Sequence, residues 1–147
     1  MPRADDAELR RKIVGTWRLV SVHYEDQGSG ARTPVYGAHP KGIQIATPEG
    51  RWLALMTAEA RTAPKTDAER AKALQTMVAY TGRYRVEEGK VVTKVEAAWN
   101  EAWVGTEQVR NIRFDGDRLY LQSPPMPHPN MDSQTVRVIV EWQRESA

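Results

Sequence analysis

Apolar and polar residues alternate along much of this chain, with the period of two that is typical of a strand with one buried face. The clearest case is residues 135–144, where apolar side chains recur at every second position and only Ile139 is out of step (Val136, Val138, Val140 and Trp142). Because a strand buries one face, the pattern predicts that these side chains point inward and that Arg144 follows them on the same face.

Seven further segments have strand character and are separated by turn signals at regular intervals. Asp115-Gly116 is a strong hairpin dipeptide between two of them. The predicted strands are residues 16–24, 42–47, 51–57, 80–86, 90–99, 103–114, 118–122 and 135–144. Eight antiparallel strands suit a sandwich or a closed up-and-down barrel, and a barrel of this size has room for one small ligand. The length of 147 residues favours a single domain.

Two helices interrupt the strand pattern. Asp5 and Glu8 have capping-box spacing and predict a helix over residues 5–13. Thr66 and Glu69 have the same spacing, and apolar residues at helical intervals extend this second helix to Val78. The second helix lies between the third and fourth predicted strands, where it is a candidate cover for one opening of a barrel.

The strand at residues 103–114 has a face that is apolar at both ends and polar in the middle. If this face points inward, Gln108 and Arg110 lie in the interior as hydrogen-bond donors for an acidic or carbonyl-bearing ligand. Alternatively, Arg110 pairs with an internal carboxylate such as Glu96 for structural reasons, or the face is outward and solvated. The sequence leaves all three interpretations open.

Aromatic and sulfur-containing side chains at strand spacing are candidate pocket walls. Tyr80 and Tyr84 share a face in one predicted strand, and Trp52 and Met56 share a face in another. Such residues also make ordinary cores, so both interpretations are retained. A third alternative is a structural or oligomerisation module whose barrel interior is filled. Its candidate contact is an outward apolar stripe of Val20, Val22 and Tyr24, which could meet a helix or a second subunit in a homodimer.

Composition narrows the function classes. Lys and Arg number 21 against 19 Asp and Glu, and the two signs are interleaved, so no basic stripe for nucleic acid is present. The chain has no cysteine. We expect a cytoplasmic protein without a membrane span, because the first residues lack the apolar core of a secretory signal and no apolar run is long enough to cross a bilayer.

The histidines give no metal site and no cofactor is expected, because His23, His39 and His128 are far apart and none has ligand spacing. His23 shares alternation with Trp17 and is a candidate for the barrel mouth. A cofactor-independent enzyme therefore stays an alternative, with His23, Tyr84 and Glu96 as acid–base candidates in the cavity. The fold alone does not indicate that the protein catalyses a reaction.

The ordered set of segments resembles the bacterial and fungal lipocalin-like domain family, of the calycin group. The matching segments are Ile13 to Ser21, Pro40 to Gly42, Tyr80 to Val86, Trp103 to Arg110, Gly116 to Leu121 and Trp142 to Arg144. The resemblance implies a calycin-type barrel with Trp17 packed at its closed end and Arg144 lying across it, both in structural roles. Members often carry a histidine in the strand that matches residues 91–95, where this chain has Thr93. We therefore expect a small, mainly apolar ligand inside an eight-stranded barrel.

Overall fold

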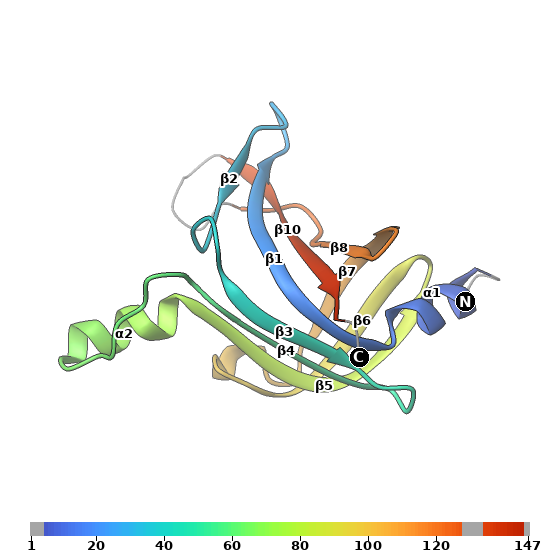
Figure 1. Ribbon diagram of the computed structural model, residues 1–147, viewed down its shortest axis with the longest axis horizontal. Coiled ribbons are helices and arrows are strands. Elements are labelled where there is room, and N and C mark those ends of the chain that lie inside the picture. Colours follow the sequence, from blue (N-terminus) through green and yellow to red (C-terminus); the bar gives the residue numbers. More distant parts are fainter. Residues whose placement is uncertain (1–4, 128–133, 146–147) are drawn as a thin grey trace.

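The computed structural model describes residues 5–127 and 134–145 and confirms the all-β, eight-stranded antiparallel barrel (Figure 1). Neighbouring strands pair in chain order, and the ring closes because the last strand pairs with the first. The barrel strands are β1 (Gly15–Asp26), β3 (Lys41–Ala46), β4 (Arg51–Thr57), β5 (Met77–Glu87), β6 (Lys90–Ala98), β7 (Glu107–Asp115), β8 (Arg118–Gln122) and β10 (Thr135–Arg144). His128 falls outside the described residues.

Three short elements supplement the ring at one end. β2 (Arg32–Pro34) pairs with the second half of β1, and β9 (Met126–Pro127) pairs with the start of β10. A 3-10 turn, η1 (Glu101–Trp103), occupies the first residues of the predicted strand 103–114, so β7 begins only at Glu107. Trp103 therefore leaves the strand alternation and turns toward the interior.

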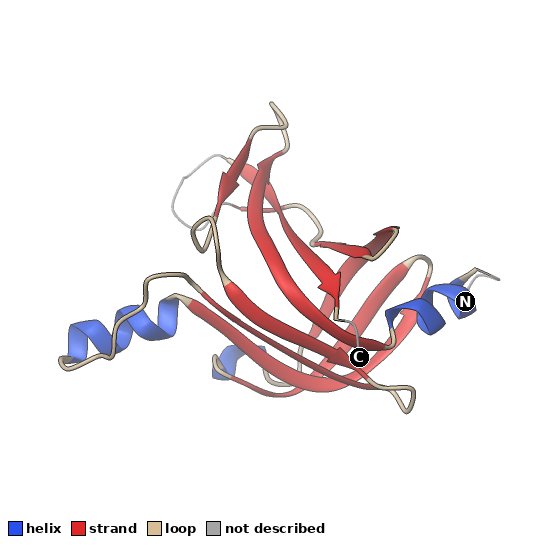
Figure 2. Cartoon of the chain, viewed as in Figure 1, coloured by secondary structure: helices blue, strands red, loops and turns tan. Residues whose placement is uncertain are grey.

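Both predicted helices form, but they have different relations to the barrel (Figure 2). α2 (Asp67–Gln75) begins with the expected capping box, in which Thr66 Oγ1 accepts from the Glu69 amide at 3.1 Å. It has no buried residue and projects away from the barrel, so the expectation that it covers an opening is wrong (Figure 1). The reason is its composition: only alanines and Leu74 are apolar, too little surface for stable docking.

α1 (Asp6–Ile13) closes the opposite end of the barrel. The Asp5 side chain makes no cap bond, contrary to the expected capping box. Instead, the buried Asp6 carboxylate accepts from the amides of Glu88 and Gly89 in the β5–β6 turn, at 2.8 and 2.9 Å. These bonds tie the helix to the hairpin that it covers. No helix in the described part of the chain is both long and apolar enough to span a membrane.

Trp17 fills the closed end. Its ring is fully buried, and its indole N–H donates to the Ile13 carbonyl at 2.9 Å. The Arg144 guanidinium lies 4.2 Å from the ring centre of Trp17 and donates to the carbonyls of Val14 and Lys12. Gly15 has φ +137°, and a Cβ there would lie 2.9 Å from Arg144 Nη1, so this glycine gives the arginine its space.

A β-bulge at Val20 reverses the alternation of β1. Leu19 pairs with Trp142 and Ser21 with Glu141, which leaves Val20 as the extra residue. Beyond the bulge, Val22 and Tyr24 face the interior. The predicted outward stripe of Val20, Val22 and Tyr24 is therefore wrong, and so is the inward placement of His23 that followed from unbroken alternation.

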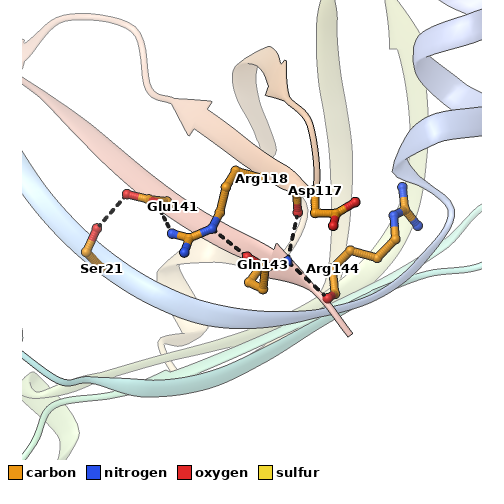
Figure 3. Close-up of polar contacts among 6 residues, drawn as sticks. All are labelled: Ser21, Asp117, Arg118, Glu141, Gln143 and Arg144. Carbon is orange, nitrogen blue, oxygen red and sulfur yellow. Dashed lines mark hydrogen bonds and ion pairs between the residues drawn. The ribbon is translucent and has the colours of Figure 1, made fainter. Parts of the chain in front are cut away.

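The outer face of β10 carries a polar network (Figure 3). Arg118 on β8 pairs with Glu141 and donates to Gln143, while Ser21 on β1 donates to Glu141 at 3.4 Å. Because these side chains lie outside, the alternating residues of β10 point inward, as the sequence predicts. Val138, Val140 and Trp142 line the interior.

Candidate functional site

The half of the barrel away from α1 contains a cavity of about 320 Å³. Its walls are mainly apolar and aromatic, with two polar side chains among them, which is the composition of a small-molecule pocket. The lining residues are Val22, Tyr24, Val35, Tyr36, Gln44, Ala54, Met56, Val78, Tyr80, Trp99, Trp103, Arg110, Leu121, Met126, Val138, Val140 and Trp142. The interior is thus hollow in this half.

Arg110 supplies the charge of the cavity. Its Nη1 donates to the Val109 carbonyl at 2.8 Å and its Nη2 donates to Gln108 Oε1 at 3.3 Å. Among the described residues, no carboxylate lies within ion-pair distance of it. Burial lowers the pKa of Arg110, which reflects the cost of holding a cation in apolar surroundings. A guanidinium keeps its proton in proteins despite such a shift, so Arg110 is charged, and no described carboxylate neutralises that charge.

Tyr80 stands near Arg110 on the cavity wall. Burial raises the pKa of its phenol, and the charge of Arg110 opposes this shift. The phenol is therefore neutral at physiological pH. Its ring lies 5.2 Å from the ring of Trp103, which in turn lies 4.7 Å from Trp99. These three rings form an aromatic wall suited to a flat apolar ligand.

Gln44 and Trp142 add polar groups beside the closed end. Gln44 is fully buried, and neither its Nε2 nor its Oε1 has a hydrogen-bond partner among the described residues. The indole Nε1 of Trp142 is likewise buried without a partner there. Gln44 pairs with Trp17 across β3 and β1, so it lies where the packed end meets the cavity.

The predicted ligand-binding residues divide between the cavity and the core below it. Met56, Tyr80 and Arg110 line the cavity. Trp52 and Tyr84 do not; their rings pack edge to face with centroids 5.6 Å apart. Tyr84 also donates its hydroxyl to the Thr47 carbonyl at 2.7 Å, and Arg10 of α1 lies 4.9 Å from its ring centre.

Two residues near Arg110, Gln108 and Thr93, do not reach the cavity. Gln108 points toward Arg110 but does not line the cavity; its Nε2 donates to Thr106 Oγ1 at 3.0 Å. Thr93 is buried and also lies outside the cavity lining. Gln108 therefore contacts Arg110 without forming part of the cavity wall.

The assumption that Glu96 faces the interior is wrong. The register of β5 and β6 shifts at Gly82, which leaves Glu96 as an extra residue on the outer surface. There it forms an ion pair with Arg51 at 2.6 Å. A Cβ on Gly82 would lie 1.9 Å from the Lys94 carbonyl oxygen, so the bulge depends on this glycine.

The proposed acid–base group is therefore not assembled. His23 and Glu96 lie outside the cavity, and the Tyr84 hydroxyl is engaged at the closed end. Among the described residues, no cluster of three or more acidic or histidine side chains could hold a metal ion.

Sequence reasoning missed Gln44 and the two tryptophans at the end of β6. Gln44 lies between Ile43 and Ile45, so hydrophobicity alone assigns the isoleucines to the interior and the glutamine to solvent. In β3 the smaller set lies inside instead: Gln44 and Ala46 are buried, and Gly42 shares their face. The signal that could have found it is the pairing with Trp17, whose inward face was predicted.

Comparison with known proteins agrees with the architecture. No curated protein matches this chain at a significant level. The family model of the lipocalin-like domain matches residues 14–145, which include every barrel strand from Gly15 to Arg144. Proteins with this barrel generally bind small molecules in the interior, where this chain has its cavity. The chain therefore belongs to the lipocalin-like domain family.

Proposed function

We propose that this protein binds a small, mainly apolar ligand that carries an acidic group, and that Arg110 receives this group inside the barrel. The observation that supports this proposal is the guanidinium of Arg110, which lies on the wall of an apolar cavity and has no carboxylate partner among the described residues. A ligand anion would compensate the charge and recover part of its lost hydration. The aromatic wall of Tyr80, Trp99 and Trp103 would hold the ligand body.

The size of the cavity limits the ligand. A volume of about 320 Å³ is near the lower end of the range of ligand pockets, so it suits one compact molecule rather than a long lipid. Binding without covalent chemistry is the function that these groups support, because the cavity brings together a cation, an amide and aromatic rings.

The test uses two fluorescent probes that share one body. 1-Anilinonaphthalene-8-sulfonate has an anionic group, and N-phenyl-1-naphthylamine lacks it. Arg110→Met should weaken the sulfonate by about 2 to 5 kcal/mol, or at least about 30-fold, while the neutral probe binds nearly as before. Arg113→Met is the matched control, because Arg113 lies on the outer alternation of β7 over Tyr120. Absence of binding by both probes to the unaltered protein, or equal losses for both in Arg110→Met, would contradict the proposal.

A further inference from the structure

The floor of the cavity carries a second polar position. Gln44 is 0% exposed, and its amide nitrogen and oxygen have no hydrogen-bond partner among the described residues. Trp142 is 1% exposed, and its indole nitrogen also has no partner there. Buried polar groups are almost always hydrogen-bonded in folded proteins. Two such side chains that line the same cavity therefore point to a partner that binds there.

The strand pairing places these two side chains on the same part of the barrel wall. Gln44 on β3 pairs with Trp17, and Trp142 on β10 pairs with Leu19, two residues further along β1. β1 lies between β3 and β10 in the ring. The amide and the indole thus belong to one region of the wall, with a single strand between them.

Arg110 lies on the wall opposite Gln44. In the closed ring, β7 is four strands from β3 in either direction and two strands from β10, which carries Trp142. Between the two walls the lining is apolar and includes Met56, Tyr80 and Leu121. A ligand whose acidic group meets Arg110 therefore extends its other end toward Gln44 and Trp142.

From this arrangement we infer that the ligand has a hydroxyl or carbonyl oxygen at the end away from its acidic group, bound by Gln44 and Trp142. An amide both donates and accepts, whereas an indole N–H only donates. A ligand oxygen can bond to both side chains. A hydroxyl would accept from the indole N–H of Trp142 and donate to Gln44 Oε1, and a carbonyl would accept from the indole N–H or from the amide N–H of Gln44. An apolar end would leave these groups without partners, so the site selects against it. This inference rests on the proposed function, because Arg110 sets the orientation.

The experiment compares rigid acids that differ by one hydroxyl. 6-Hydroxy-2-naphthoate is compared with 2-naphthoate, and 4′-hydroxybiphenyl-4-carboxylate with biphenyl-4-carboxylate, which tests two lengths. Titration calorimetry should show at least tenfold tighter binding of the hydroxylated acid for one of the two lengths. Gln44→Leu should remove this preference and leave the affinity for the unsubstituted acid within about threefold. Gln143→Leu, which removes a glutamine amide on the outer face of β10, should keep the preference.

The outcomes separate the two proposals. Binding of the plain acids that depends on Arg110, without any hydroxyl preference, would overturn the inference and leave the proposed function standing. A preference that survives Gln44→Leu would also overturn it. Failure of all four acids to bind would contradict both. If Gln44→Leu does not fold, Trp142→Phe replaces it, because it removes only the indole N–H and keeps a large aromatic ring; it should reduce the preference at least threefold.

Discussion

The closed end and the cavity are built from the same strands but treat their polar groups differently. At the closed end, the indole N–H of Trp17, the hydroxyl of Tyr84 and the guanidinium of Arg144 all donate to backbone carbonyls. In the cavity, the amide of Gln44 has no partner and Arg110 has no counter-ion among the described residues. Polar groups that the protein satisfies itself stabilise the fold, and the unpartnered groups that line the cavity mark a place where another molecule can bind. The indole Nε1 of Trp52, in the packed half, also has no partner among the described residues but does not line the cavity.

Replacement of Trp17 should give the largest effect and tests the closed end. Trp17→Ala leaves a cavity where a fully buried ring was packed and also frees Arg144 from its contact, so the free energy of unfolding should fall by about 3–5 kcal/mol. Guanidinium unfolding measures it. Trp103→Ala, at the half-buried rim of the cavity, should cost clearly less. Equal losses in the two variants would show that the two ends do not differ in this way.

Asp6 tests whether α1 is an integral part of the closed end. Asp6→Ala removes a buried carboxylate that accepts from two backbone amides, and bonds to charged groups are each worth about 1.5–3 kcal/mol. We expect a loss of about 2–4 kcal/mol in the same unfolding assay. The control is Asp5→Ala, since Asp5 is exposed and makes no cap bond, and this variant should be nearly neutral. A similar loss for Asp5→Ala would contradict this assignment.

Replacement of Arg144 tests the contact of its guanidinium with the Trp17 ring at the closed end. Arg144→Ala removes a cation–π contact and two bonds to carbonyls, one in the last turn of α1 and one at Val14 after it, so it should lower stability by about 1–2 kcal/mol. Arg144→Lys keeps the charge without the planar fork and should recover only part of this loss. Probe binding in the cavity should stay unchanged in both variants, because the role predicted for Arg144 is structural. Lost binding with unchanged stability would reverse that interpretation.

Replacement of Gln44 in the cavity should raise the free energy of unfolding rather than lower it. Gln44→Leu replaces an unpartnered buried amide by an apolar side chain of similar size, and the free energy of unfolding should rise by about 1 kcal/mol. Such an exchange of stability against binding is expected where a polar group serves a ligand. Thermal unfolding of the ligand-free protein measures it. A loss of more than about 1 kcal/mol would show that Gln44 belongs to the packed end instead.

The barrel was predictable because its signal is spread over many residues, whereas the cavity depends on a few local irregularities. Alternation in β10 and the hairpin turns predicted the eight strands, and the resemblance to the lipocalin-like domain family favoured a closed barrel over a sandwich. The inward side chains of β1 and β6 depend on single extra residues, Val20 and Glu96, which reverse or displace the alternation and leave little trace in the sequence. In β4 the alternation was informative: the shared face of Trp52 and Met56 is the buried one, and Leu53 and Leu55 lie outside, 43% and 42% exposed.

Alkaline pH should produce the smallest effect and compares tyrosines of both regions. Burial raises the pKa of Tyr80 in the cavity and of Tyr84 at the closed end above the ordinary value of about 10. Above that pH the unfolded chain loses protons that the folded chain keeps, so stability should fall as pH rises through this range. Denaturant unfolding at a series of pH values measures the slope.

Two phenylalanine variants separate the two tyrosines. Tyr80→Phe and Tyr84→Phe should each make the alkaline slope shallower, because each removes a phenol whose ionisation opposes folding. At neutral pH they should differ: Tyr84→Phe loses the bond to the Thr47 carbonyl and should cost about 1 kcal/mol. Tyr80→Phe loses a phenol beside Arg110, and its main effect should fall on probe binding. An unchanged slope in both variants would show that other groups cause the alkaline loss.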